Sequence, residues 1–223
     1  MRIFVQICLF IFPWVIRRRL LCWLFNYHIH PEAWIGYSII LAKELEMKQS
    51  AKIRNLVFCK PIDRISMGED TVIGSGCYIT GFPSSAEKQF FRHVLSRQCE
   101  LVLEHGAAIT GRQYLDCNGG IYIGSFSIVA GLRTQILTHC IDVYNNRQYA
   151  ASVRIGKYCY VGTGCIILPG AELPDYCLLG AGSVLNKKYS TPKTLYAGNP
   201  ARPKKELIVE ETLWMQRTAR LSF

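Results

Sequence analysis

Aliphatic residues recur at every sixth position through the C-terminal half of the chain. The longest run comprises Ile155, Val161, Ile167, Leu173, Leu179 and Leu185. The fifth position of the same six-residue units is always small, and it is filled by Cys159, Cys165, Ala171, Cys177 and Ser183. The same phasing returns around Ile73, Ile109 and Ile123. An amphipathic helix repeats at about 3.6 residues and an exposed strand at about two, so a period of six fits neither.

This period predicts an all-β fold in which each six-residue unit forms one flat face of a parallel β-coil. The aliphatic residue points inward, and the small residue sits where the interior is narrow. Stacked coils bury a continuous aliphatic column and pair the backbone of each coil with its neighbours. Buried strands of an ordinary α/β sheet are the alternative, but they do not explain a small residue at every fifth position.

The repeat divides the chain into three parts. We predict a hydrophobic and basic N-terminal segment over residues 1–60, a β-helix over 61–203 and a C-terminal helix over 204–223. The six-residue phase breaks over 82–100 and again over 140–152. The second break is polar and irregular, whereas the first contains the aromatic residues Phe82, Phe90 and Phe91, and we expect both to leave the coil as loops.

The first segment is strongly apolar but short. Residues 3–16 are mostly apolar, whereas a spanning helix needs about 20 such residues. The cluster Arg17–Arg19 follows the apolar run instead of preceding it, which is unlike a secretory signal peptide. Residues 1–27 therefore suit peripheral membrane contact or, equally, packing against the folded body. We expect a cytoplasmic protein, either free or at the cytoplasmic face of the membrane.

The net charge and the cysteine content limit the kinds of partner that we expect. The net charge is +10, and the excess of Lys and Arg lies at the two ends of the chain. No nucleic-acid-binding motif is recognisable, so membrane lipids or a phosphorylated small molecule are better suited partners than a nucleic acid. The ten cysteines form no C-x-x-C pair, and four of them occupy the small position of the repeat. We therefore expect them to serve packing, and we expect no metal site.

Three stretches carry a resemblance to a known family. They are I-G-K-Y-C-Y-V-G-T-G-C-I-I-L-P-G-A-E-L (155–173), L-G-A-G-S-V-L-N-K (179–187) and A-G-N-P-A-R-P (197–203). The chain resembles the hexapeptide-repeat acyltransferases, whose fold is a left-handed parallel β-helix, and A-G-N-P-A is similar to the sugar O-acetyltransferase branch. The resemblance spans roughly residues 65–207. It implies an acetyl-CoA-dependent enzyme without a metal, a homotrimer, and an active site between subunits.

The candidate general base is His139. Removing a proton from a sugar hydroxyl requires a base, and histidine has a suitable pKa. His139 stands at the start of the second break in the repeat, and it matches the position of the family's catalytic histidine. Asp142 either orients His139 or simply begins the loop. His93, in the first break, is the second candidate for the base.

Two sets of residues are candidates for binding the donor and the acceptor. The resemblance implies that the donor is held by Gly162, Thr163, Ala181, Gly182, Asn186, Lys187 and Arg202. Polar side chains in turns suggest that the acceptor is held by Arg112, Asp116, Asn118, Asn146 and Arg147. The alternative for this second set is that these residues only shape turns.

Together these features predict an acetyl-CoA-dependent O-acetyltransferase with His139 as its base. The expected acceptor is a sugar hydroxyl of a surface polysaccharide (exopolysaccharide, capsule or lipopolysaccharide) or of its lipid-linked precursor. One alternative is an N-acetyltransferase of a nucleotide-linked amino sugar or a xenobiotic O-acetyltransferase on the same fold. Another is a β-helix scaffold without activity.

Overall fold

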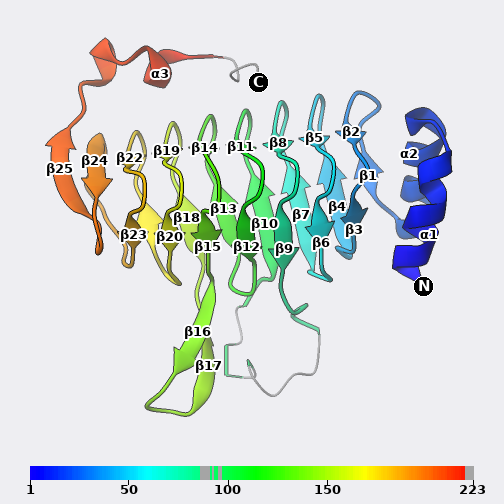
Figure 1. The fold of residues 1–223 in the computed structure, drawn as a ribbon, viewed down its shortest axis with the longest axis horizontal. Coiled ribbons are helices and arrows are strands. Elements are labelled where there is room, and N and C mark those ends of the chain that lie inside the picture. The colour runs from blue at the N-terminus through cyan, green and yellow to red at the C-terminus, as the bar shows by residue number, and fades with distance from the viewer. Residues whose placement is uncertain (86–90, 92, 95–96, 219–223) are drawn as a thin grey trace.

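Three parallel β-sheets wind around one long axis in the computed structural model, which describes residues 1–85, 91, 93–94 and 97–218 (Figure 1). The chain visits the first, second and third sheets in turn and then begins the next coil. Neighbouring strands in a sheet are therefore one coil apart. The predicted all-β fold, a parallel β-helix, is confirmed.

The strands are short, and each sheet runs the length of the coil. The first sheet contains β1 (His28–Ile29), β4 (Glu44–Met47), β7 (Arg64–Met67), β10 (Glu100–Leu103), β13 (Ile121–Ile123), β18 (Val153–Ile155) and β21 (Glu172–Leu173). The second contains β2 (Trp34–Ile35), β5 (Lys52–Ile53), β8 (Val72–Ile73), β11 (Ala108–Ile109), β14 (Ile128–Val129), β19 (Tyr160–Val161), β22 (Leu178–Leu179), β24 (Thr194–Ala197) and β25 (Arg202–Glu206). The third contains β3 (Ile39–Ile40), β6 (Phe58–Cys59), β9 (Tyr78–Thr80), β12 (Tyr114–Asp116), β15 (Gln135–Ile136), β20 (Ile166–Ile167) and β23 (Val184–Leu185).

The six-residue pattern has a direct structural cause. Ile155 pairs with Leu173, three units later, so the aliphatic residues stack coil upon coil. The six aliphatic residues of the longest run are all buried. The small position also lies inside, where Cys159, Cys165 and Cys177 have no exposed surface. Burial raises the pKa of the Cys177 thiol to about 11, which keeps it in the protonated, unreactive form.

The coil begins earlier than the sequence pattern indicates. The expected boundary at residue 61 is wrong, because β1 already pairs with β4 in the first sheet, and His28 lies opposite Glu46. The inward residues Ile29 and Ile35 are six positions apart, but the next one, Ile40, follows after five. This shortened step conceals the repeat in the first coils.

Helices close the N-terminal end of the coil. α1 (Arg2–Cys8), the 3₁₀ turn η1 (Leu9–Ile11) and α2 (Trp14–Phe25) lie across the first coil in Figure 1, and we call residues 2–25 the N-terminal cap. Leu9 and Leu21 are buried in this contact. Of the two interpretations of the first segment, the structure therefore shows the packing of this segment against the folded body. Among the described residues, no helix combines the length and hydrophobicity that a membrane crossing requires.

Over residues 204–218, the described part of the expected C-terminal helix 204–223, the helix is limited to Leu213–Gln216. β25 instead pairs antiparallel with β24, because that strand ends the second sheet and has an edge that needs a partner. A short arm follows, with the 3₁₀ turn η3 (Val209–Glu211) and the four-residue helix α3 (Leu213–Gln216). Trp214 packs edge-on against Tyr160, with ring centroids 5.5 Å apart, so the arm turns back along the second sheet. Residues 219–223 lie outside the described part of the chain.

Both predicted excursions leave the coil at one corner. We call it the third corner, where the chain passes from the third sheet back to the first; the second corner joins the second and third sheets. The earlier excursion lies between β9 and β10, and the described part of it includes Phe91. The later one is a hairpin of β16 (His139–Asp142) and β17 (Arg147–Ala150) (Figure 1). It is ordered antiparallel strand rather than the irregular loop expected from its composition.

Candidate active site

His139 is placed by the base of this hairpin. It is the first residue of β16 and pairs with Ala150, so its backbone is fixed by strands on both sides of the corner. Its side chain is 32% exposed. The residue therefore stands at the surface of the third corner with its backbone held and part of its ring open to solvent.

Asp116 holds the imidazole of His139. It ends β12, one coil earlier on the same corner, and its side chain is fully buried. Its Oδ2 accepts hydrogen bonds from the backbone N–H of Thr138 at 3.0 Å and of His139 at 3.1 Å, and it also contacts Nδ1 of His139. Its Oδ1 accepts from Nδ2 of Asn118 at 2.6 Å. Among the described residues, Nε2 of His139 has no hydrogen-bond partner and is the nitrogen that can meet a ligand.

The contact between Asp116 and His139 shifts the pKa values of both side chains. The hydrogen bond to Asp116 raises the pKa of His139 above its usual 6.5; burial opposes the rise, and the charge of Asp116 adds to it. Burial alone acts to raise the pKa of Asp116, but the hydrogen bond and charge of His139, with the backbone N–H groups of Asn118 and Thr138, hold that pKa below 3.8. The carboxylate thus stays ionised, and the imidazole accepts a proton at Nε2 once the pH exceeds its raised pKa.

Asp142 does not orient His139. It lies at the far end of β16, where its carboxylate accepts from Nδ2 of Asn145 at 2.8 Å and from Nε of Arg147 at 3.3 Å. No hydrogen bond joins it to His139 in the described part of the chain. Of the two roles expected for Asp142, the structure favours shaping the turn, because it lies three positions along β16 from the histidine.

Asp116 and Asn118 are unsuited to the acceptor-binding role expected for them. Both side chains are buried, and their polar atoms are already paired. Oδ1 of Asn118 accepts from the backbone N–H of Phe82 at 2.9 Å, and its Nδ2 also lies 3.2 Å from Nδ1 of His139. The two residues form the support beneath the histidine. The sequence had placed them one coil before His139, but distance along a coil does not reveal which side chains turn inward.

The first excursion contributes two neighbours that the sequence did not single out. Phe91 is buried and meets the ring of His139 edge-on, with centroids 6.1 Å apart. The guanidinium of Arg97 lies 4.6 Å from the centroid of the Phe91 ring, and it donates to the backbone oxygen of Phe82 at 2.6 Å. Counting the phase of the repeat would have shown that both breaks leave the same corner, which is the signal that unites them. His93, the other candidate base, is exposed.

Four of the expected donor residues stack on the second corner. A Cβ added at Gly162 would lie 2.7 Å from the backbone N of Ala181, so the coils approach closely there. The backbone N–H of Gly182 donates to the oxygen of Thr163 at 2.9 Å. Arg112 lies on this corner as well, two coils earlier, and is not beside His139. The result is a column of small residues along one edge of the coil.

The other expected binding residues are spread over three places. Asn186 and Lys187 follow β23 and are exposed on the third corner, two coils beyond His139. Arg202 is exposed in β25. Asn146 and Arg147 are exposed near the tip of the hairpin, about 10 Å along the strands from His139.

Within one chain, the expected donor-binding residues of the second corner therefore lie far from His139 on the third corner. The second and third corners are divided by the width of the third sheet, roughly 15–20 Å for a six-residue face. Among the described residues, no group of three or more His, Cys, Asp or Glu side chains is arranged to hold a metal ion.

Comparisons with known proteins agree with this architecture. Residues 152–187 match the family model described as the hexapeptide repeat of succinyl-transferase. A curated Schizosaccharomyces pombe protein named as an acetyltransferase is 32% identical over 88 residues, which are 37% of this chain and 42% of that protein. The match thus spans less than half of that relative's length.

The comparison with solved structures gives, among others, two matches that cover most of the chain. The polysialic acid O-acetyltransferase OatWY superposes with a TM-score of 0.61 at 19% identity, covering 82% of this chain and 85% of that one. An N-acyltransferase, AntD from Bacillus cereus in complex with dTDP and coenzyme A, gives a TM-score of 0.48 at 14% identity, covering 86% and 90%.

The fold is thus a left-handed parallel β-helix built from hexapeptide repeats. Residues 152–187 carry the repeat of the matching family model, and the fold of the whole coil is similar to that of a solved O-acetyltransferase.

Proposed function

We propose that this protein is an acetyl-CoA-dependent O-acetyltransferase with His139 as its general base. The observation that carries the proposal is the hydrogen-bonded pair of Asp116 and His139 at a corner of the coil. The carboxylate engages Nδ1, so the ring presents an unprotonated Nε2 at pH values above its raised pKa. A partly exposed base held in one orientation by a buried carboxylate suits removal of a proton from a hydroxyl.

The transfer proceeds directly between donor and acceptor. His139 takes the hydroxyl proton at Nε2 as the oxygen attacks the thioester carbonyl carbon. The tetrahedral intermediate collapses with cleavage of the C–S bond, and His139 returns its proton to the departing thiolate. Asp116 stabilises the imidazolium that exists between these two proton transfers, since its carboxylate contacts Nδ1.

The proposed acceptor is a sugar hydroxyl of a surface polysaccharide or its lipid-linked precursor. The similar structure OatWY is named as acting on polysialic acid, which supports a polysaccharide acceptor. Two excursions frame the third corner and could contact an acceptor beside His139. The exposed hairpin residues Asn146 and Arg147 offer polar groups to a chain that extends beyond the reacting sugar.

The proposed donor site lies between subunits of a homotrimer. Gly162, Thr163, Ala181 and Gly182 form a narrow column suited to the pantetheine arm, with Arg202 near its end for a phosphate. Asn186 and Lys187 lie on the histidine's own corner. Because the column and His139 occupy different corners of one chain, a neighbour that brings its second corner to this third corner would complete the site.

Acetyl transfer from labelled acetyl-CoA to lipid-linked and polysaccharide acceptors tests the assignment. We expect His139→Ala to lower kcat/KM about 100-fold or more, since general-base catalysis contributes about 10²–10⁴. His105→Ala is the matched control, because it removes an exposed histidine elsewhere on the coil, and His93→Ala tests the other candidate base; both should keep normal activity.

The identity of the product separates the remaining alternatives. An O-acetyl ester is released by hydroxylamine, whereas an N-acetyl amide is not, so mass spectrometry before and after this treatment distinguishes the two. Normal turnover by His139→Ala, or an equal loss in His93→Ala, contradicts the proposed base. A protein that binds no acetyl-CoA in a calorimetric titration would instead be a scaffold.

A further inference from the structure

The N-terminal cap satisfies the open end of the coil. Each coil donates its backbone N–H groups to the next one: Trp34 donates to Ala51 at 2.9 Å and Gly36 to Ile53 at 2.8 Å. The carbonyl groups of the first coil consequently have no preceding coil to supply donors. Buried carbonyl groups without partners are costly, so the cap must supply donors.

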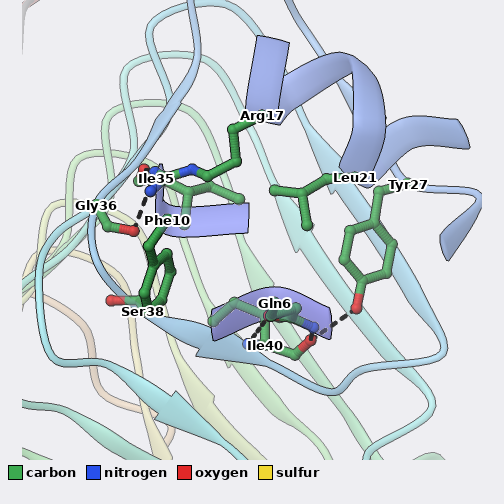
Figure 2. A pocket seen from close by; sticks show the side chains of 9 residues that line it. All are labelled: Gln6, Phe10, Arg17, Leu21, Tyr27, Ile35, Gly36, Ser38 and Ile40. Carbon is green, nitrogen blue, oxygen red and sulfur yellow. Dashed lines mark hydrogen bonds between the residues drawn. The ribbon is translucent and has the colours of Figure 1, made fainter. Parts of the chain in front are cut away.

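Polar side chains of the cap meet this demand. Nε2 of Gln6 donates to the oxygen of Ile40 at 2.6 Å, and Nε1 of Trp14 donates to Ala33 at 2.9 Å. Arg17 is buried and donates to the oxygens of Ile35 and Gly36. Figure 2 shows the side chains of Gln6 and Arg17 reaching from the helices toward the first coil. Several polar side chains of the cap therefore point inward, toward the first coil.

The outer face of the cap is correspondingly apolar. Among the exposed residues of 1–27, Arg19 is the only charged one. The exposed apolar side chains are Ile3, Phe4, Ile7, Ile11, Phe12, Val15, Ile16, Trp23 and Leu24. Ile11 is 86% exposed, and Trp23 is 79% exposed. This arrangement reverses the usual helix of a water-soluble protein, which places apolar residues inside and polar residues outside.

The charge around this face selects one kind of partner. The first 31 residues contain no Asp or Glu, and of their four arginines Arg19 is exposed, Arg2 and Arg18 are half-buried and Arg17 is buried. Arg19 and Trp23 are four positions apart on α2 and so lie on one side of the helix. Exposed isoleucine, phenylalanine and tryptophan beside arginine match the composition of helices that lie in the interface of an anionic bilayer.

We propose that the outer face of the N-terminal cap binds the surface of a bilayer containing anionic lipids. The cap lies at one end of the long axis in Figure 1, away from the hairpin of β16 and β17 that begins with His139, so membrane binding leaves the histidine accessible. The apolar side chains enter the headgroup region, and Arg19 pairs with lipid phosphates or carboxylates. This proposal does not depend on acetyl transfer.

Sedimentation with vesicles tests it on the full chain. Phosphatidylcholine vesicles are compared with vesicles of phosphatidylcholine mixed with phosphatidylglycerol. We expect binding to the mixed vesicles. Trp23→Ser should weaken that binding about tenfold or more, because it removes the apolar surface of an aromatic side chain that enters the headgroup region. Arg19→Gln should weaken it about fivefold on mixed vesicles and leave binding to pure phosphatidylcholine unchanged.

Matched controls keep the result interpretable. Leu213→Ser removes a side chain that is 83% exposed on the C-terminal arm, and it should bind vesicles normally. Deleting residues 1–27 is unsuitable, because it would strip the donors from the first coil. Trp23 and Arg19 are exposed, so their substitutions should leave the thermal unfolding midpoint unchanged. Equal binding by all variants overturns the proposal, as does self-association through the cap without vesicle binding, which would identify a second copy as the partner.

Discussion

The second and third corners of this coil are built from the same repeat and differ in almost every other respect. The second corner is uninterrupted, and its residues are small: Gly162 stacks so closely on Ala181 that a Cβ would lie 2.7 Å from the neighbouring backbone. The third corner carries both excursions and holds the buried carboxylate of Asp116 beneath His139.

The contrast shows how a repetitive fold acquires a site. A regular corner offers the same shape in each coil, which suits a long flexible ligand lying along the axis. A reactive group needs an arrangement that occurs once, and the repeat cannot supply it. Here it arises where inserted segments interrupt the repeat while β18 still pairs with β13, so that the coil itself is undisturbed.

Mixing two inactive variants gives the largest expected effect. Ala181→Trp would block the second corner at an exposed position, and His139→Ala removes the base, so each should be nearly inactive alone. If one site uses corners from two subunits, mixed oligomers contain some intact sites and should recover measurable acetyl transfer. Subunits are exchanged by mild denaturation and refolding. Absence of recovery in verified mixed oligomers would indicate that one chain makes the whole site.

Asp116→Asn probes the support of the histidine. The amide cannot stabilise the imidazolium as a carboxylate does, so we expect kcat/KM to fall about tenfold to 100-fold. In the native enzyme the rate should rise with pH through the pKa of His139, which lies above 6.5. Because Asp116 is the main cause of that rise, the variant should move the acidic limb of the profile to lower pH. An unchanged limb would contradict the pairing.

The same pair makes stability depend on pH. The raised pKa of His139 contributes stability that is fully present below about 6.5 and is lost as the pH rises through the folded-state value. The lowered pKa of Asp116 contributes stability that is present above about 3.8 and is lost as the pH falls through its folded-state value. The stabilisation of native protein over Asp116→Asn should therefore be greatest between these limits, as measured by urea unfolding at several pH values.

Gly162→Ala tests how tightly the second corner is stacked. The added methyl group meets the backbone of the next coil, so the free energy of unfolding should fall by about 1–3 kcal/mol. Thr163→Ser, at the exposed neighbouring position, retains the hydroxyl that bonds Leu132 and should unfold like the native protein. Equal free energies of unfolding for the two variants would show that the backbone at this corner shifts enough to accommodate the added methyl group.

Asp142→Asn should have the smallest effect. Its contacts belong to the hairpin turn, and its carboxylate is remote from the imidazole, so we expect less than about a threefold change in kcat/KM. Comparison with Asp116→Asn in the same assay gives the result its meaning. A loss as large as that of Asp116→Asn would return the orienting role to Asp142.

The repeat made the coil predictable because each inward aliphatic residue reports a purely local rule. Ile155, Val161 and Ile167 face inward whatever surrounds them, so six-residue spacing sufficed to predict the fold and the packing of the cysteines. The same rule failed where spacing varied, as in the five-residue step before Ile40. The six-residue rule also did not predict the C-terminal arm, because the pairing of β25 with the edge of β24 outweighed the local helical composition.

The sequence by itself determined the coil, the two interruptions and the histidine at the start of the second. Only the tertiary structure decided that Asp116 rather than Asp142 supports that histidine, that Phe91 packs beside it, and that the polar groups of the N-terminal cap face inward. The physical reason is that periodicity specifies the direction of a side chain relative to its own strand. Which groups meet across a corner depends on coils stacked one turn away, and hydrogen-bond demand at the end of the coil is set by the whole assembly of strands.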